Sequence, residues 1–404
     1  MPTTLSPSPP STDLDLFASY DRASRLEQYR QLRDLSDVVR LEQHDVYAIT
    51  SYDAVRSVLA DHETFISGEG VGFTQSINEI LRGTTLASDP PEHDLLRSVV
   101  ATGLQPRAVR GRRDEIAEKA RGVVTAALVK GADRGRIEGV TDLAQAMPLS
   151  VIPDFLGLPE QNRDRLFEWA QGGTDNLGPT SERTPHNNEM SRCIAGYTSD
   201  LAARRDLAPG SLGASVLAAA DEGVIPEQKC PVLLIDYIGP SLETTATAIG
   251  HLLVTFAEHP EQWRILQEDP GLVASAINEL VRYESPIRGF TRVAARDAEV
   301  SGLTIPAGSR VWTLLASANR DERKWESPDA FDVRRNPLDH LAFGYGTHGC
   351  AGQGVARLEL HALFHALLDS VERIELIGEP VIAENSMLNT WASIPLRLVT
   401  TGGR

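Results

Sequence analysis

Helical patterns of apolar and polar positions cover most of the chain, whereas strand patterns are few and short. Apolar residues recur at helical spacing in 25–35 and 52–59, and β-branched and aromatic residues dominate 45–50 between them. Further short strands are predicted near 299–301, 310–315 and 396–400. There is no internal repeat and no linker rich in proline or glycine. The pattern therefore predicts one mainly α domain over 13–404, with small sheets near its ends.

The longest helical pattern runs from Pro231 to Phe256 and is apolar nearly all round, which predicts a buried central helix. Its middle is unusual, because Gly239-Pro240-Ser241 and the pair Glu243-Thr244 lie inside it. Pro240 lacks the N–H that would bond the carbonyl of Asp236, so a kink is expected there. A carboxylate in an apolar helix is costly unless it is paired. The segment therefore indicates either a proton path or a kinked structural helix whose glutamate forms a salt bridge.

Two segments are expected to lack regular structure. Residues 1–12 are rich in Pro, Ser and Thr, and they have neither the basic nor the apolar region of a signal peptide, so a disordered tail is predicted. The glycine-rich run at 67–72 interrupts the helical pattern. It is predicted to begin a mobile loop that extends to about Leu86.

Composition and charge narrow the class of protein. The 404 residues carry 56 acidic and 39 basic side chains, a net charge of −17, which favours a soluble protein and argues against nucleic-acid binding. No apolar run reaches the length of a membrane span, so no membrane association is predicted. The three cysteines, Cys193, Cys230 and Cys350, form no close pairs. This excludes a disulfide framework or a zinc site and fits a reducing cytoplasm.

The third cysteine lies in an unusual loop. The stretch from Phe343 to Gly352 places Cys350 among four glycines, with His348 two residues before it and a helical pattern directly after it. Glycine tolerates positive φ and close approach, so the loop can direct backbone amides at a single atom. Such amides and a helix N-terminus lower the pKa of a thiol. The loop is therefore expected to hold Cys350 as an anion.

Several shorter patterns are ambiguous when each is taken alone. His93 and Arg97 share one face of a helix that is predicted to begin after two prolines, and they either grip a carboxylate or lie on a solvated surface. Glu279 and Arg282 also share a helical face, a spacing that chance surface pairs give as well. A basic cluster in this acidic chain is either a solvated patch or a docking site for an acidic partner: Arg107, Arg110, Arg112 and Arg113.

Together these features resemble the bacterial cytochrome P450s over nearly the whole chain, from about Tyr47 to Leu398. The E-x-x-R helix and the acid–threonine pair on the central helix belong to the resemblance. It implies the cytochrome P450 fold, with a haem b between the long central helix and the cysteine loop and the Cys350 thiolate as axial ligand of the iron. The family's F-x-x-G-x-H-x-C-x-G pattern is present at every position: Phe343, Gly346, His348, Cys350 and Gly352.

The resemblance also implies roles for residues outside the loop. Glu279, Arg282 and Arg335 correspond to a buried ion-pair triad behind the haem loop. Thr244 is expected to hydrogen-bond dioxygen, and Glu243 is expected to relay protons to it. Two departures from the family pattern bear on the relay geometry, namely Glu in place of the more frequent Asp and Pro240-Ser241 in place of Ala-Gly. The positions that contact the haem propionates correspond to His93, Arg97, Arg292 and His348.

The chain has no flavin or nicotinamide motif, so its electrons must come from another protein. The resemblance implies a small 2Fe–2S ferredoxin and its reductase as partners of a monomeric, cytoplasmic enzyme. The arginines from Arg107 to Arg113 follow the helix that carries Arg97, on the side from which such partners approach. This favours the docking interpretation of the basic cluster.

Among bacterial members the likeness is greatest to the enzymes that act on para-substituted benzoates, through stretches such as 148–151, 207–210 and 317–321. The positions that hold the benzoate carboxylate correspond here to Glu69, Thr74, Ile235, Asp236 and Gly239. The cation is lost at these positions and acids are nearby. Arg288 would partly compensate if it pointed inward, but the prediction is that it is exposed. The prediction is a small, largely apolar, aromatic substrate that is neutral or cationic, with a methoxyphenol or other aryl ether as the leading candidate.

Eight side chains are predicted to line the substrate pocket, although ordinary core packing would explain each of them as well: Val71, Phe73, Ile235, Ile238, Gly239, Ile287, Phe290 and Trp391. Three other functions remain open. A peroxide-driven peroxygenase would use Glu243 as an acid–base group, although Thr244 favours dioxygen. A thiolate-haem sensor would not need the acid–alcohol pair. A biosynthetic P450 would act on a larger or carrier-bound natural product.

Overall fold

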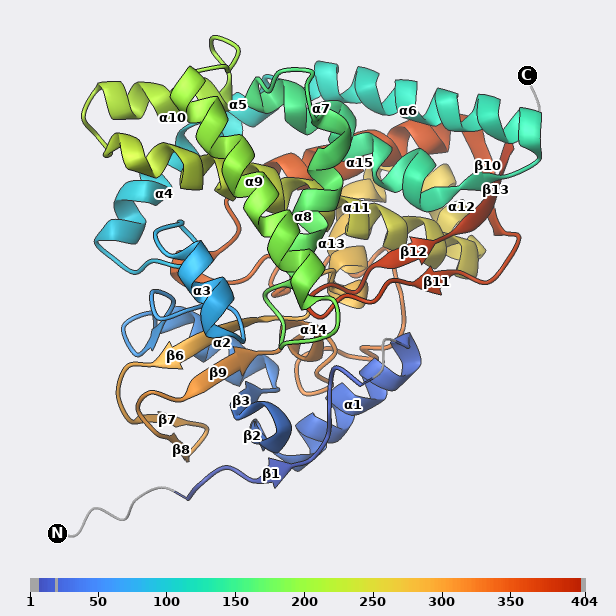
Figure 1. Ribbon diagram of the computed structural model, residues 1–404. Coiled ribbons are helices and arrows are strands. Elements are labelled where there is room, and N and C mark those ends of the chain that lie inside the picture. The colour runs from blue at the N-terminus through green and yellow to red at the C-terminus, as the bar shows by residue number, and fades with distance from the viewer. Residues whose placement is uncertain (1–6, 19–20, 401–404) are drawn as a thin grey trace, which may run out of the picture.

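The computed structural model describes residues 7–18 and 21–400, and most of these residues are helical (Figure 1). The predicted mainly α fold class is therefore confirmed. The helices are, in chain order, α1 (Arg22–Leu35), α2 (Tyr52–Ala60), α3 (Gln75–Leu81), α4 (Glu92–Thr102), α5 (Pro106–Arg110), α6 (Arg113–Arg134), α7 (Ala146–Leu156), α8 (Leu166–Asp175), α9 (Thr184–Arg204), α10 (Leu212–Asp221), α11 (Cys230–Glu258), α12 (Pro260–Glu268), α13 (Val273–Glu284), α14 (Leu315–Ala318) and α15 (Gln353–Ser370).

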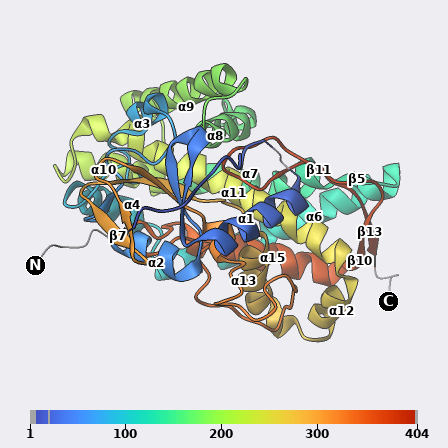
Figure 2. The same cartoon turned by 90° about the horizontal axis from the view of Figure 1, so that it is seen from below.

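Helix α11 passes through the middle of the helical part of the molecule in both views (Figure 1, Figure 2). Its side chains are buried from Leu242 to Phe256 except at Thr244, so the predicted buried central helix is confirmed. At the proline, the hydroxyls of Ser241 and Thr244 donate to the carbonyls of Tyr237 and Pro240, the latter at 2.7 Å. Hydroxyls that bond back to the preceding turn bend a helix, and here they lie beside the amide that Pro240 lacks. No described helix combines the length and hydropathy needed to cross a bilayer.

The larger sheet has six strands in the order β1-β2-β3-β9-β6-β4 and lies below the helices in Figure 1. It joins residues 11–66 to residues 290–313, which are far apart in the sequence. The other sheets have the orders β10-β13-β5, β11-β12 and β7-β8. The strands are β1 (Ser11–Thr12), β2 (Val38–Leu41), β3 (Val46–Ile49), β4 (Phe65–Ile66), β5 (Ile137–Glu138), β6 (Phe290–Ala294), β7 (Ala298–Val300), β8 (Leu303–Ile305), β9 (Arg310–Thr313), β10 (Val371–Leu376), β11 (Val381–Ile382), β12 (Trp391–Ser393) and β13 (Pro395–Thr400).

The N-terminal segment differs from the predicted tail. Residues 1–6 lie outside the described residues, but Ser11 and Thr12 form β1 and pair in parallel with Arg40 and Leu41. The carbonyl of Pro7 also accepts a hydrogen bond from the Thr304 N–H at 3.1 Å. The prediction of disorder is therefore wrong for residues 7–12, because their backbone completes the edge of the six-stranded sheet.

The segment at 67–86 is not an irregular loop throughout, because it contains α3. Thr74 caps this short helix, and Ile77 is buried within it. The amide of Asn78 donates to the carbonyl of Gly72 at 3.1 Å, and its side-chain oxygen accepts from the Gly72 N–H at 2.9 Å. The Phe73 N–H donates to the carbonyl of Leu177 at 2.8 Å, which ties the segment to the chain after α8. A helix of seven residues leaves little periodic pattern, which explains why the sequence did not reveal it.

Candidate active site

A cavity of about 250 Å³ lies between α11 and the cysteine loop. Its lining is mainly apolar, and it brings together segments from α4, α11, β6, α15 and the loop itself. The polar or charged groups that matter for the chemistry below all face this one space: Arg97, Asp236, Thr244, Arg292, His348 and Cys350.

The cysteine loop is closed by its own backbone. The Cys350 N–H donates to the carbonyl of Phe343 at 2.8 Å, and the Gly349 N–H donates to that of Gly346 at 3.0 Å. Gly346 has φ +68°, the left-handed region that favours glycine. A Cβ there would also lie 2.5 Å from the Leu59 carbonyl oxygen of α2. Only glycine at position 346 therefore lets the loop turn this tightly against α2.

The Cys350 thiol lies beside the first turn of α15. Burial raises the pKa of this thiol, and the backbone N–H groups of Gly352 and Gln353 and the Arg97 guanidinium oppose that effect. The expected amide cradle is thus present, but burial outweighs it in the protein alone. A metal ion bound to the sulfur would remove the proton, because coordination deprotonates a thiol outright.

Four side chains that can donate hydrogen bonds gather at one edge of the cavity. The rings of His93 and His348 lie 4.4 Å apart, and Nε2 of each is buried without a hydrogen-bond partner among the described residues. Burial lowers the pKa of His348 to about 2, and Arg292, His93 and Arg97 add to the effect through their charges. Arg292 is itself buried, and burial lowers its pKa to about 10. Arg97 donates to the carbonyl of Gly349.

These residues fit a haem b. Buried cations and orphaned imidazole nitrogens are costly in a protein interior unless anions meet them, and the two propionate carboxylates would do so. The thiol that would bind iron faces the same cavity. Six side chains predicted from the sequence could hold the cofactor here, and the backbone N–H of Gly352 could support the cysteine sulfur. The six are Cys350, His93, Arg97, Arg292, His348 and Phe343.

Behind the loop, Glu279 and Arg282 form a fully buried ion pair with two contacts, of 2.7 and 2.8 Å. Arg335 reaches the same carboxylate at 3.1 Å, so the structure assembles all three members of the predicted triad. Arg282 also donates to the carbonyls of Asn319 and Pro328, at 2.9 and 3.0 Å. The triad therefore holds the irregular chain before the cysteine loop against α13.

Glu243 and Thr244 are neighbours that face different spaces. Thr244 lines the haem cavity, whereas Glu243 lines a separate cavity of about 20 Å³ beside Gln171 and Thr390. Oε1 of Glu243 accepts from Asn385 at 3.3 Å, and Oε2 is buried without a partner among the described residues. Burial raises the pKa of Glu243 to about 8, the nearby Thr174 side chain opposes this, and the charge of Asp175 adds to it.

The surroundings of Glu243 exclude the interpretation of this residue as a salt-bridged glutamate. No salt bridge reaches its carboxylate among the described residues. Polar groups on neighbouring segments reach solvent, but the one hydrogen bond to Glu243 in the described part of the chain comes from Asn385. Asp175 accepts from Arg183 at 2.8 Å, and Arg183 pairs at 3.2 Å with Glu384, whose side chain is 68% exposed. Asn385, the next residue, donates to Glu243.

Two of the eight predicted pocket side chains, Ile287 and Phe290, line the haem cavity. On α11 the lining falls on the face of Asp236, Pro240 and Thr244, four residues apart. The predicted positions Ile235, Ile238 and Gly239 lie outside this lining, because they belong to other faces of the same helix; Ile238 is fully buried in the core.

The remaining predicted pocket residues lie elsewhere. Val71 is buried in a cluster with Ile77, Ala87, Leu177 and Met387, against which Phe290 packs. Phe73 meets the rings of Phe17 and Trp312 edge-on, at 5.3 and 5.1 Å. These two side chains therefore belong to the apolar packing of the loop that covers the cavity, and they do not line it.

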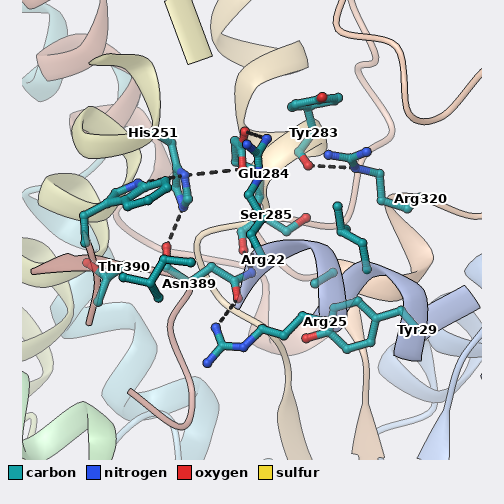
Figure 3. A pocket seen from close by; sticks show the side chains of 14 residues that line it. Arg22, Arg25, Tyr29, His251, Tyr283, Glu284, Ser285, Arg320, Asn389 and Thr390 are labelled. Atoms are coloured by element: carbon teal, nitrogen blue, oxygen red, sulfur yellow. Dashed lines mark hydrogen bonds and ion pairs between the residues drawn. The ribbon is translucent and has the colours of Figure 1, made fainter. Parts of the chain in front are cut away.

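Trp391 borders two small cavities on the other side of α11. Its Nε1 donates to Nδ1 of His251 at 3.3 Å. Figure 3 shows the polar groups around this point, where Glu284 lies between His251 and the Arg22 side chain. Burial lowers the pKa of His251. Because this network joins the end of α11 to α1 and to the chain before β12, we interpret it as structural.

Of the positions that correspond to a benzoate-carboxylate site, only Asp236 lines the cavity. Glu69 is exposed and Thr74 caps α3. Arg288 is fully buried, which corrects the expectation that it is exposed. Its guanidinium donates to Tyr29 Oη, Ser386 O and Leu16 O at 2.7–3.0 Å, so the core satisfies it without a carboxylate.

The sequence analysis did not identify several residues that line the cavity. Thr85 and Leu86 come from the end of the loop after α3 and carry no motif. Glu359 lies on α15, is 1% exposed and has an unpartnered Oε1 among the described residues. Burial raises its pKa to about 8. The signal for Glu359 was its place four residues from both Val355 and Leu363, on the buried face of the helix.

Comparison with known proteins agrees with this geometry. Residues 215–375 match the family described as Cytochrome P450. The chain is 35% identical over 392 residues to Cytochrome p450 CYP199A2 of Rhodopseudomonas palustris, covering 96% of this chain and 94% of that protein. It is 32% identical over 369 residues to the Steroid C26-monooxygenase of Rhodococcus jostii, covering 88% of this chain and 76% of that protein.

Among solved structures, the Mycobacterium marinum cytochrome P450 CYP268A2 in complex with pseudoionone aligns with a TM-score of 0.86 and 29% identity, covering 98% of both chains. The two curated relatives cover 96% and 88% of this chain, and the solved structure covers 98% of it. The chain therefore belongs to the cytochrome P450 family of haem b monooxygenases.

Proposed function

We propose that this protein is a ferredoxin-dependent monooxygenase that inserts one oxygen atom from O2 into a small aromatic substrate, neutral or cationic, by hydroxylation or O-demethylation. The observation that carries the proposal is the cavity itself. Cys350 and Thr244 both face it, and Ile287 and Phe290 give it an apolar wall suited to an aromatic ring.

The bound haem supplies dioxygen activation, and a thiolate ligand favours cleavage of the O–O bond. Thr244 contributes a hydroxyl whose proton is donated to the Pro240 carbonyl at 2.7 Å. Its oxygen can therefore accept a hydrogen bond from the cavity side. That arrangement lets Thr244 hold a proton-bearing group in place while the proton is transferred.

Glu243 is the proposed proton donor to this site. Its raised pKa, of about 8, keeps the carboxyl protonated at neutral pH, and the adjoining cavity of about 20 Å³ has room for water. Water in that cavity, which Gln171 and Thr390 also line, would bring each replacement proton to Glu243. Glu243 stands outside the haem cavity, which disfavours direct acid–base attack on peroxide and hence the peroxygenase alternative.

The size of the substrate follows from what covers the cavity. The buried cluster of Val71, Ile77 and Leu177 packs against Leu86 and Phe290, which line the cavity, so we expect a large natural product to displace this cluster. A single aromatic ring requires no such rearrangement. This supports the small-substrate proposal over the biosynthetic alternative.

The proposed ferredoxin site is the basic cluster on α5 and the start of α6. Arg107, Arg110 and Arg113 are exposed, whereas Arg112 pairs with Glu115 at 2.9 Å and covers the Phe155 ring. Helix α5 contacts α15, whose first turn follows Cys350. An acidic partner that docks there would approach the cysteine side of the haem.

The test is reconstitution. The purified holoenzyme, with a 2Fe–2S ferredoxin, its reductase and NAD(P)H, should convert a methoxyphenol to the diphenol and release one formaldehyde per substrate. Hydrogen peroxide alone should support much slower turnover. Faster turnover with peroxide than with the complete electron-transfer system would reject the proposal in favour of a peroxygenase. We also propose a monomer in the cytoplasm, which size-exclusion chromatography and cell fractionation would check.

A further inference from the structure

Asp236 is a carboxylate that faces the haem cavity at a distance from its oxygen-activating part. It lies on the same face of α11 as Thr244, eight residues earlier, which is roughly 12 Å along the helix axis. The side chain is shielded from bulk solvent but partly accessible from the cavity. Its Oδ2 accepts a hydrogen bond from the Thr85 N–H at 2.7 Å, which fixes the orientation of the carboxylate.

The second oxygen of this carboxylate, Oδ1, accepts no hydrogen bond from the described residues. Two cations act on Asp236 through their charge, but both have other partners. Arg97 donates to the Gly349 carbonyl and belongs to the group of side chains that fits the haem propionates. Lys229 pairs with Glu92 at 2.6 Å. Asp236 therefore lines the cavity with a carboxylate that the Thr85 N–H orients and that forms no salt bridge among the described residues.

We propose that Asp236 is the substrate-recognition residue of this enzyme, and that it selects an aromatic substrate bearing a protonated amine on a short arm. This inference rests on the proposed function and narrows it from neutral or cationic substrates to cationic ones. The ammonium N–H donates to Oδ1 of Asp236, while the ring lies between Ile287 and Phe290 and the opposite end of the substrate points toward Thr244.

Two physical arguments favour a cation over a neutral ligand. A carboxylate out of water gains most from a charge-assisted hydrogen bond, which is about twice as strong as a neutral one. Burial raises the pKa of Asp236 to about 6, although the N–H and the side chain of Thr85 and the charges of Arg97 and Lys229 oppose this rise. The carboxyl therefore remains mostly ionised at pH 7 and repels a ligand carboxylate. The site thus discriminates by charge at the end remote from the reaction.

The test compares three ligands that share a 4-methoxyphenyl group and differ in the charge of the group at the end of a short arm. They are 2-(4-methoxyphenyl)-N,N-dimethylethylamine as the cation, 2-(4-methoxyphenyl)ethanol as the neutral compound and 4-methoxyphenylacetate as the anion. The tertiary nitrogen is too hindered to bind iron readily. Dissociation constants for the holoenzyme come from the haem spin-state shift and, independently, from calorimetry. We expect the amine to bind about tenfold or more tightly than the alcohol, and the anion to bind weakest.

The variant Asp236→Asn keeps the shape and an acceptor for the Thr85 N–H but removes the charge. It should abolish the preference for the amine and leave the affinity for the alcohol within about twofold of the original. Glu69→Gln removes an equal charge from an exposed residue outside the cavity lining, and it should leave all three affinities unchanged. The affinity of the original protein for the amine should fall as pH is lowered through about 6, where Asp236 gains a proton, while the affinity for the alcohol stays constant.

Equal binding of the amine and the alcohol would overturn the inference, as would an amine preference that survives in Asp236→Asn or failure of all three ligands to bind. These results are distinct from failure of the proposed function. If the alcohol binds and is oxidised without charge preference, the monooxygenase proposal stands and the recognition proposal falls. If the amine binds through Asp236 but no ligand is turned over with ferredoxin, the recognition proposal stands and the monooxygenase proposal falls.

Discussion

At the scale of single residues, the Glu243 carboxyl controls the proton supply in the proposed mechanism. In Glu243→Gln the side chain keeps its size and its contact with Asn385 but cannot release a proton. We expect turnover to fall by about 10²-fold. Because the pKa of Glu243 is raised to about 8, the original rate should decline as pH rises through 8, and the variant should lose that step. Steady-state rates from pH 6 to 9 would show this, with the spectrum of the reduced CO complex as a control for intact haem.

The buried Glu359 permits a prediction about stability. Burial raises its pKa to about 8, above its ordinary value, so the folded protein retains a proton that the unfolded chain releases between about pH 4.5 and 8. The contribution of this group to stability is therefore complete at low pH and lost as pH rises through that window. Glu359→Gln removes this dependence. The unfolding temperature of the variant relative to the original should increase from pH 5 to pH 8, and a constant difference would contradict the assignment.

Some residues of the candidate site could be predicted from the sequence, and others could not. Cys350 lies in a long and specific motif, whereas chance surface pairs often have the spacing of Glu279 and Arg282, so only the family resemblance indicated the roles of these two residues. Neighbouring residues on α11 point to different sides of the helix, so an error of one position selects the wrong face. The sequence analysis predicted Ile235, Ile238 and Gly239, which lie outside the cavity lining. Arg288 was misjudged because a buried guanidinium satisfied by carbonyls and aromatic rings leaves no mark in the local sequence.

At the scale of an element, the cysteine loop depends on the glycine at 346. Gly346→Ala adds a Cβ 2.5 Å from the Leu59 carbonyl in a left-handed conformation, so the loop must shift. We expect a lower haem content and a lower unfolding temperature. Gly354→Ala on α15 is the matched control, because its Cβ would make only ordinary contacts with Val109 at 3.9 Å. Pyridine haemochromogen assays of both variants measure the difference, and equal haem content would contradict the steric argument.

The periodicity of apolar residues predicted long helices better than short ones. Helix α11 has 29 residues and a continuous apolar pattern, and its prediction was correct within two residues at the C-terminal end. Helix α3 has seven residues between glycines and turns, and what holds it is the Asn78 bracket around Gly72 and the contact of Phe73 with Leu177. The bond between Phe73 and Leu177 connects residues that are far apart in the sequence. A local pattern of residues does not reveal such a bond, so the sequence predicted a loop here.

At the scale of the whole molecule, long-range pairing determined what the sequence could not. The six-stranded sheet joins β3 to β9 in parallel, and β1 at its edge orders residues that the composition had suggested were disordered. Each strand alone is two to five residues long and carries little pattern. The separation of Glu243 and Thr244 into two cavities is a similar outcome, since it depends on how α8, α11 and the chain before β12 pack together.

The charge distribution of the whole molecule gives the last prediction. A protein with net charge −17 repels an acidic partner at long range, so the proposed ferredoxin should approach productively at the basic cluster of α5 and α6 near the cysteine side. Replacing Arg107, Arg110 and Arg113 together by Glu should raise the KM for ferredoxin about tenfold or more and leave substrate binding unchanged. In the original protein this KM should rise with salt, whereas in the variant the reversed charges repel the partner, so added salt should lower the KM.

A matched triple variant separates local docking from net charge. Arg134, Arg192 and Arg264 are also exposed, on α6, α9 and α12, and their replacement by Glu changes the net charge of the molecule by the same amount. If docking is local, this control should shift the KM for ferredoxin far less than the α5 variant does. Equal effects of the two variants would mean that the total charge governs association and that the arginines of α5 and α6 are an ordinary solvated surface. The salt titration then distinguishes the cases further, because only a local charge pair retains its salt dependence when the distant charges are reversed.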